Sequence, residues 1–219
     1  ITVSIKFLLK VANRRLSSML HVVRFVARFV YGTKLVEMIE HFRHTPMNIL
    51  LIGFMGSGKT TIANRLANNL GFEFLDTDEL IEKNAFKSIN EIFTDEGESE
   101  FRKLESQVLG ELEGRERMVI ATGGGIVSSG DNIERLRKIV IVFWLDAGVD
   151  SILERVSRNN DRPLLKTNDP RKTILSLLDQ RHKKYSECSD ERIPTDGLSI
   201  EEVSFGISET ARLWFAKRG

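Results

Sequence analysis

The sequence predicts an α/β fold in which helices cover both faces of a parallel β-sheet. Short apolar runs alternate with segments of helical periodicity along most of the chain, which is the pattern of repeated strand–helix–strand units. The chain has 219 residues, of which 41% are hydrophobic and 29% are charged. This composition is that of an ordinary globular protein, and the length fits one domain with an appendage.

The N-terminal 46 residues differ in charge from the rest of the chain. They contain eight Lys/Arg and two Glu, whereas the whole chain has a formal net charge of +1, so the remainder is mildly acidic. This balance argues against a nucleic-acid-binding role for the whole protein. We place a boundary at Pro46, which separates a basic extension, 1–46, from a domain that covers 47–219.

Three interpretations of the extension 1–46 remain open. It could be an Arg-rich targeting segment, a basic helix that binds an anionic membrane or a partner, or upstream sequence that is not a natural part of the protein. We expect a cytoplasmic protein, or one of a plastid or another organelle if the extension is a transit segment. The single cysteine, Cys188, excludes an intramolecular disulfide framework, and no run of about eighteen apolar residues predicts a membrane span.

Five segments of the domain have the composition of buried strands, the last of them weakly: 48–53, 72–76, 118–122, 139–145 and 192–195. Helical periodicity lies between and after them, in a helix closed by Gly71, a helix that begins near Asp78, and one longer helical region, 89–112. Four further segments are predicted to be helical: 131–137, 149–157, 170–187 and 199–217.

A glycine-rich motif follows the first predicted strand. Residues 53–60, GFMGSGKT, fit G-x-x-x-x-G-K-[ST] between a buried strand and an amphipathic helix. Glycines allow backbone N–H groups to surround phosphate oxygens, Lys59 would neutralise the β- and γ-phosphates, and the Thr60 hydroxyl would bind Mg²⁺. A simple strand-to-helix turn is the alternative interpretation. The context favours a nucleoside triphosphate site, and no NKxD-type guanine-reading segment points to a GTPase.

Two carboxylates end the second predicted strand, at Asp76 and Asp78. Alternate residues of an extended segment point the same way, so we expect both side chains to face the phosphates. One could hold Mg²⁺ or its water, and the other could orient or deprotonate an attacking hydroxyl. Asp78 could instead only cap the next helix.

Other charged and glycine-rich segments are each weak signals when taken alone. Arg102 and Glu105 share a helical face and would ordinarily form a surface ion pair, and Gly123–Gly125 could form a simple turn. Arg162 lies in a polar loop, and Arg181 lies four residues before Tyr185 on a predicted helix. Surface arginines are usually solvated, so the order of these motifs carries the argument. None of the four histidines has the spacing of a convincing metal site.

The motifs GFMGSGKT, DTD, FRKLE, TGGG, RPLL and RHKKY occur in an order and at separations that closely resemble the shikimate kinases. The resemblance extends from about residue 48 to the last predicted helix. It implies a P-loop kinase three-layer fold like that of the nucleoside-monophosphate kinases, with a five-stranded parallel sheet flanked by helices. It also implies transfer of the γ-phosphoryl group of ATP to the 3-hydroxyl of shikimate, a step toward chorismate and the aromatic amino acids, with Mg²⁺ as cofactor.

The resemblance also implies residue roles. The catalytic residues would be Lys59, Asp78 and Arg162. Shikimate would be bound by Asp78, Arg102, Gly124, Gly125 and Arg181, with the two arginines on its carboxylate and with Glu105 orienting them. ATP would be bound by Gly56, Ser57, Gly58, Lys59, Thr60, Thr61, Arg155 and Arg162. Thr60 and Asp76 would bind the metal. We expect a monomer that binds these small molecules and no nucleic acid.

Two other functions remain open at this stage. The first is phosphorylation of another acceptor, either a polyol acid such as gluconate or a nucleotide. The second is a catalytically silent module that keeps the fold. The paired arginines and the TGGG segment favour shikimate over other acceptors, and the intact charged groups Lys59, Thr60, Asp76 and Asp78 argue against a silent module.

Overall fold

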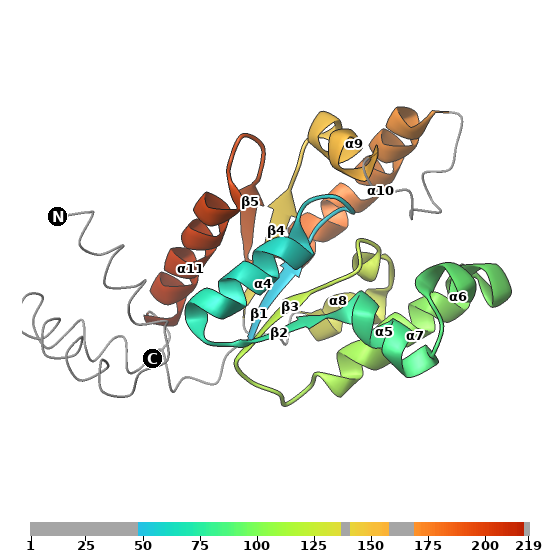
Figure 1. The fold of residues 1–219 in the computed structure, drawn as a ribbon, viewed down its shortest axis with the longest axis horizontal. Helices are drawn as coiled ribbons and strands as arrows, with labels where there is room; N and C mark the ends of the chain where they lie inside the picture. Colours follow the sequence, from blue (N-terminus) through green and yellow to red (C-terminus); the bar gives the residue numbers. More distant parts are fainter. Residues whose placement is uncertain (1–47, 137–140, 158–168, 217–219) are drawn as a thin grey trace, which may run out of the picture.

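A computed structural model describes residues 48–136, 141–157 and 169–216, drawn in Figure 1 with the element labels used below. The extension 1–46 and the predicted Arg162 loop lie outside the described residues. Within the described ranges, no helix is both long enough and apolar enough to cross a membrane.

The centre of the structure is a five-stranded sheet in which every neighbouring pair of strands is parallel. The strand order is β2-β3-β1-β4-β5. All five predicted strands are confirmed, including the weak last one: β1 (Asn48–Ile52), β2 (Glu73–Asp76), β3 (Met118–Ala121), β4 (Ile141–Asp146) and β5 (Glu191–Pro194). The central strand β1 is buried along its whole length, as its continuous apolar run predicts.

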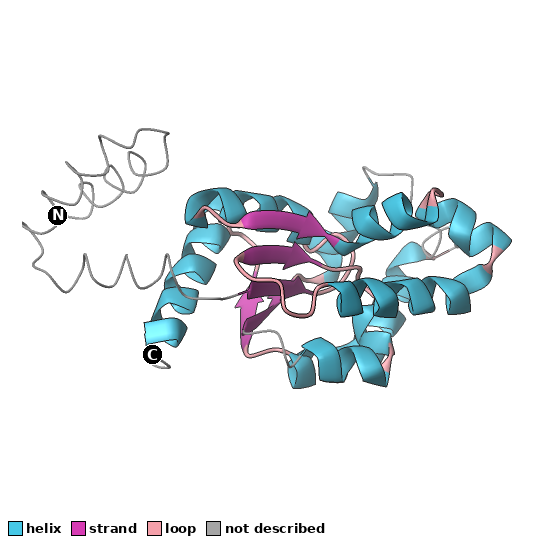
Figure 2. Ribbon diagram, turned by 90° about the horizontal axis from the view of Figure 1, so that it is seen from below, coloured by secondary structure: helices cyan, strands magenta, loops and turns pink. Residues whose placement is uncertain are grey.

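Helices lie on both sides of this sheet, which confirms the three-layer prediction (Figure 2). The helical elements are α4 (Lys59–Leu70), α5 (Thr77–Ala85), α6 (Ile89–Asp95), α7 (Gly97–Glu111), the 3₁₀ turn η1 (Ile126–Ser128), α8 (Gly130–Leu136), α9 (Val149–Ser157), α10 (Pro170–Cys188) and α11 (Ile200–Ala216). One apolar cluster joins α4 and α11 to one face of the sheet, with Ile62 and Ile207 as examples. A second joins α7, α8 and α10 to the other face, with Leu109 and Tyr185 as examples.

The predicted helical region 89–112 is helical, but the structure divides it into two helices. Helix α6 ends at Asp95, and α7 begins at Gly97, whose φ of +85° is a left-handed conformation that favours glycine. A capping box between Ser88 and Glu91 fixes the start of α6. The break allows α7 to fold back on α6, and the rings of Phe93 and Phe101 then lie 4.8 Å apart.

The parallel sheet determines where the site can form. All strands run in one direction, so their carboxyl ends lie along one edge, which is where open α/β folds bind ligands. The segments that follow β1, β2 and β3 therefore meet at this edge. They are the glycine-rich motif, the acidic pair and the Gly123–Gly125 segment.

Candidate active site

The glycine-rich motif forms a tight loop between β1 and α4. Gly53, Gly56 and Gly58 all have positive φ, at 144°, 76° and 92°, so side chains at these positions would be strained. A Cβ on Gly53 would collide with the Leu145 carbonyl oxygen of β4. No side chain caps the N-terminus of α4. The first N–H groups of this helix can therefore bind an anion.

Lys59 and Ser57 lie inside the loop. Lys59 is 8% exposed, and its Nζ donates to the carbonyl oxygens of Gly53 and Phe54, at 2.9 Å each. Ser57 is fully buried, and its Oγ has no hydrogen-bond partner among the described residues. Thr61 is exposed on the first turn of α4. A loop that holds an ammonium group and a spare hydroxyl at the uncapped N-terminus of a helix is suited to a polyphosphate.

Thr60 and Asp76 are in direct contact. The Thr60 hydroxyl donates to Asp76 Oδ2 at 2.7 Å, and Asp76 Oδ1 accepts from the backbone N–H of Asp78 at 2.9 Å. Mg²⁺ prefers oxygen ligands and is usually held by one or two carboxylates together with substrate phosphates. The pair fits that donor set. Among the described residues, no group of three or more His, Cys, Asp or Glu forms a metal site made of protein ligands alone.

The structure corrects the expected conformation of the acidic pair. Asp78 is not part of an extended segment, because it lies in the first turn of α5. The residue that caps α5 is Asp76, through its contact with the Asp78 N–H, so the alternative in which Asp78 is the cap is also wrong. Asp76 and Asp78 still line one cavity, because the first turn of α5, rather than strand alternation, brings both side chains to it.

Arg102 and Glu105 form a buried ion pair rather than a surface pair. Glu105 is fully buried, and its Oε2 accepts from Arg102 Nη1 at 2.6 Å. Arg102 also donates from Nη2 to Glu98 at 2.7 Å. Burial raises the pKa of Glu105 to about 7, while Arg102 opposes that shift and the nearby charge of Asp78 adds to it. Two carboxylates thus hold the guanidinium at the cavity wall.

The Gly123–Gly125 segment lies where side chains would not fit. A Cβ on Gly123 would lie 2.6 Å from Asp78 Oδ1 and 2.8 Å from Glu105 Oε1, and one on Gly124 would lie 2.9 Å from the Met55 nitrogen. A Cβ on Gly125 would collide with the Arg102 guanidinium. The three glycines therefore allow the backbone to lie between the phosphate loop and the charged residues of α5 and α7.

Arg181 approaches the same segment from the opposite side. It is 7% exposed, and its Nη1 donates to the Gly124 carbonyl oxygen at 3.1 Å. The Tyr185 hydroxyl donates to the same oxygen. The Arg181 guanidinium also lies 5.7 Å from the centre of the Phe54 ring, which places it beside the phosphate loop.

Some of these groups line one cavity of about 470 Å³ at the carboxyl edge of the sheet, whereas Lys59, Ser57 and Tyr185 do not line it. Its predicted lining residues are Thr60, Asp76, Asp78, Arg102, Glu105, Gly124, Gly125 and Arg181. Sequence reasoning missed two aromatic residues, Phe93 and Phe101, because their helical spacing is equally typical of core residues. The available signal was that Phe101 is the first residue of the FRKLE motif, with Phe93 eight residues before it. Arg155 lies apart from this cavity, and its Nη1 contacts the Gly56 carbonyl oxygen at 3.2 Å.

A parallel sheet, a glycine-rich phosphate loop with its lysine and threonine, and a neighbouring polar cavity define a P-loop phosphotransferase for a small acceptor. The shikimate kinase family model matches residues 55–212. A shikimate kinase from Thermodesulfovibrio yellowstonii is 45% identical over 157 residues, which cover 72% of this chain and 90% of that protein. The chain belongs to the shikimate kinase family.

Solved structures agree with this membership. A shikimate kinase from Acinetobacter baumannii in complex with shikimate is 38% identical, with a TM-score of 0.75 over 79% of this chain and 96% of that one. The enzyme from Bacteroides thetaiotaomicron is 30% identical, with a TM-score of 0.71 over 76% of this chain and 99% of that one. A deoxyadenosine kinase from M. mycoides, 15% identical with a TM-score of 0.52 over 75% of this chain and 99% of that one, shares the fold alone.

Proposed function

We propose that this chain transfers the γ-phosphoryl group of ATP to the 3-hydroxyl of shikimate, yielding shikimate 3-phosphate and ADP. The observation that carries the proposal is one cavity that joins the end of the phosphate loop to two arginines on separate helices. A guanidinium is planar and matches a carboxylate with two parallel hydrogen bonds, so a pair of arginines suits an acidic acceptor. Membership of the shikimate kinase family supports the same acceptor.

The phosphate end of the site binds and neutralises the triphosphate. The loop amides and the N-terminus of α4 surround the phosphates, and Lys59 exchanges its contacts with loop carbonyls for phosphate oxygens. Thr60 Oγ1 and Asp76 Oδ2 would hold Mg²⁺, which when bound neutralises charge on the β- and γ-phosphates. Arg155, whose Nη1 contacts the Gly56 carbonyl oxygen, is proposed to bind the nucleotide, and Arg162 is proposed to cover the transferred group.

The acceptor end of the site binds shikimate and takes its proton. Arg102 and Arg181 would hold the carboxylate, with Gly124 and Gly125 as close backbone neighbours. Asp78, which lines the cavity and whose backbone N–H contacts Asp76, would accept the proton of the 3-hydroxyl. The new P–O bond forms to the 3-oxygen while the bond from the γ-phosphorus to the oxygen of ADP breaks. The cytoplasmic location and the monomeric state stay predictions.

The test measures ADP formation from MgATP in the presence of shikimate, gluconate or nucleoside monophosphates, each at the same concentration. We expect turnover with shikimate. Turnover only with another acceptor would support the alternative kinase, and nucleotide binding without turnover would support the silent module. Asp78→Asn serves as the inactive control: it should bind ATP normally, while kcat falls by about 10²–10⁴ if Asp78 acts as the general base.

A further inference from the structure

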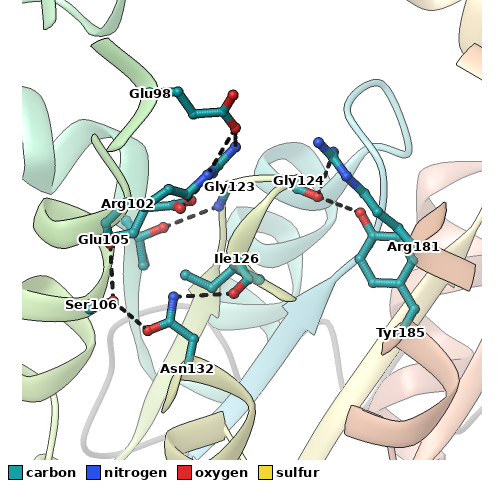
Figure 3. A network of polar contacts seen from close by, with 11 residues as sticks. Glu98, Arg102, Glu105, Ser106, Gly123, Gly124, Ile126, Asn132, Arg181 and Tyr185 are labelled. Atoms are coloured by element: carbon teal, nitrogen blue, oxygen red, sulfur yellow. Dashed lines mark hydrogen bonds and ion pairs between the residues drawn. The ribbon is translucent and has the colours of Figure 1, made fainter. Parts of the chain in front are cut away.

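The two acceptor arginines lie on helices that are attached to the same glycine segment from opposite sides. Helix α7 carries Arg102, helix α10 carries Arg181, and Gly123–Gly125 lies between them (Figure 3). A segment of three glycines has no side chain through which neighbours could hold it. Its position depends on its backbone groups and on those of the turn η1 that follows.

The α10 side is held through one carbonyl group. The oxygen of Gly124 accepts from Arg181 Nη1 at 3.1 Å and also from the Tyr185 hydroxyl. Tyr185 is fully buried, and its ring stacks on Trp144 with the ring centres 5.7 Å apart. Burial raises the pKa of Tyr185 to about 12, so its hydroxyl stays a donor over the working range of pH.

The α7 side is held through a buried amide. Asn132 of α8 is fully buried, and its Nδ2 donates to the Ile126 carbonyl oxygen of η1 at 3.2 Å. Its Oδ1 accepts from the Ser106 hydroxyl at 2.7 Å, and Ser106 is also 3.0 Å from the Arg102 carbonyl oxygen. Figure 3 shows this chain of contacts from the backbone of α7 to η1, the turn that follows the glycine segment.

We propose that Tyr185 and Asn132 are positioning residues that together fix the separation between Arg102 and Arg181 through the glycine segment. Neither residue lines the cavity, so neither would touch the substrate. Each donates to a carbonyl oxygen of the same short stretch, Gly124 to Ile126, from a different helix. Loss of either contact lets one arginine-bearing helix move relative to the other. The binding of one carboxylate by both arginines depends on the distance between them. This inference rests on the proposed function.

The test uses Tyr185→Phe, which deletes only the hydroxyl, and Asn132→Leu, which keeps the branched shape of the side chain and removes both polar contacts. KM values for shikimate and for ATP are measured separately. We expect each variant to raise the shikimate KM by about fivefold, the effect of one net hydrogen bond, and to leave the ATP KM within about twofold. Ser204→Ala is the matched control, because Ser204 is a fully buried residue of α11 whose Oγ has no partner among the described residues.

The split between the two KM values separates positioning from general stability. A merely structural role would lower the melting temperature and the active fraction without changing the shikimate KM alone. The inference is overturned if Tyr185→Phe leaves the shikimate KM unchanged, or raises both KM values alike, whatever happens to the folding of Asn132→Leu. Absence of shikimate turnover in the unaltered chain would instead contradict the proposed function.

Discussion

At the scale of single residues, Glu105 combines two demands that oppose each other. Its carboxylate orients Arg102 at 2.6 Å, which requires the ionised form, yet the side chain is fully buried beside Asp78. Burial and the like charge both favour the protonated form, and its pKa is raised to about 7. The residue that holds the acceptor arginine is therefore an acid that titrates near neutral pH.

This raised pKa gives the protein a pH-dependent stability with a definite sign. An unfolded glutamate has a pKa of 4.5, so between pH 4.5 and pH 7 the folded state binds the proton that the unfolded state has lost. The stabilisation from Glu105 is therefore complete below pH 4.5 and is lost as the pH rises through 7. Glu105→Gln removes this titrating group. The free energy of unfolding should then vary with pH by up to about 3 kcal/mol less than in the unaltered chain, measured by urea denaturation at several pH values.

The control for that experiment is Glu111→Gln, which removes an exposed carboxylate from the end of the same helix. Its pH profile should parallel that of the unaltered chain. If Glu105→Gln also leaves the profile unchanged, Glu105 does not titrate near neutral pH in the folded protein.

Arg181 should be irreplaceable even by another cation. Lysine keeps the positive charge but offers a single flexible ammonium group, which cannot form two parallel bonds to a carboxylate. We expect Arg181→Lys to raise the shikimate KM by about tenfold or more, with the ATP KM little changed. Arg171→Lys is the matched control, since Arg171 lies in the first turn of the same helix and forms an exposed pair with Asp150. An unchanged shikimate KM in Arg181→Lys would contradict the carboxylate assignment.

At the scale of elements, a methyl group added to the glycine segment should impair shikimate binding rather than folding. In Gly125→Ala the new Cβ would displace the Arg102 guanidinium, the flexible end of a long side chain, rather than backbone. We therefore expect a shikimate KM raised by about tenfold and a nearly unchanged melting temperature, because a charge-assisted contact is lost without disturbing the core.

Gly206→Ala serves as the matched control, because it should change stability and leave the kinetics unchanged. Gly206 lies within α11, and a Cβ there would have no neighbour within 4 Å. Alanine favours the helix, so this variant should be more stable by about 0.5–1 kcal/mol with unchanged kinetics. A loss of stability in Gly125→Ala as large as that of a core cavity would show that the segment serves packing instead.

The sequence predicts elements well where one physical pattern decides them. Continuous apolar runs bounded by glycine identify β1 and β3, and Gly71 marks the end of α4 with φ +68°. It predicts poorly where two patterns compete. Helical spacing continues from α6 into α7, and the two helices are separated at Glu96 and the left-handed Gly97. The conformation at Asp78 depends on a cap by Asp76, which extended-strand reasoning could not anticipate.

The same contrast holds for the candidate site. The phosphate loop could be recognised because its chemistry lies in eight consecutive residues. The burial of Glu105 could not be recognised, since a glutamate three residues from an arginine ordinarily forms a solvated pair. Here Glu105 is buried where α7 lies against the glycine segment. Asn132 carried no signal, because its two contacts depend on how α8 packs on α7 and η1.

At the scale of the whole molecule, one region of the chain supplies every group of the site that the structure describes. These groups extend from the phosphate loop to Arg181, and they meet only because parallel strands bring their carboxyl ends to one edge. The match to the shikimate kinase family, at residues 55–212, covers nearly all of this region and extends beyond Arg181. Folding and catalysis should therefore depend on the predicted domain, 47–219, and not on the extension 1–46.

A shortened chain that begins at Met47 tests this division directly. Strand β1 starts at Asn48, and its Ile49 already lies in the apolar cluster that includes Phe215 of α11, so the shortened chain retains the complete described core. We expect its kcat, both KM values and its melting temperature to match those of the full chain within about twofold and a few degrees. Adsorption of the full and the shortened chain to anionic lipid vesicles then measures separately whether the basic charge of the extension binds anionic surfaces. A shortened chain that loses activity or unfolds at a much lower temperature would show that the extension is part of the folded domain, and the boundary at Pro46 would be wrong.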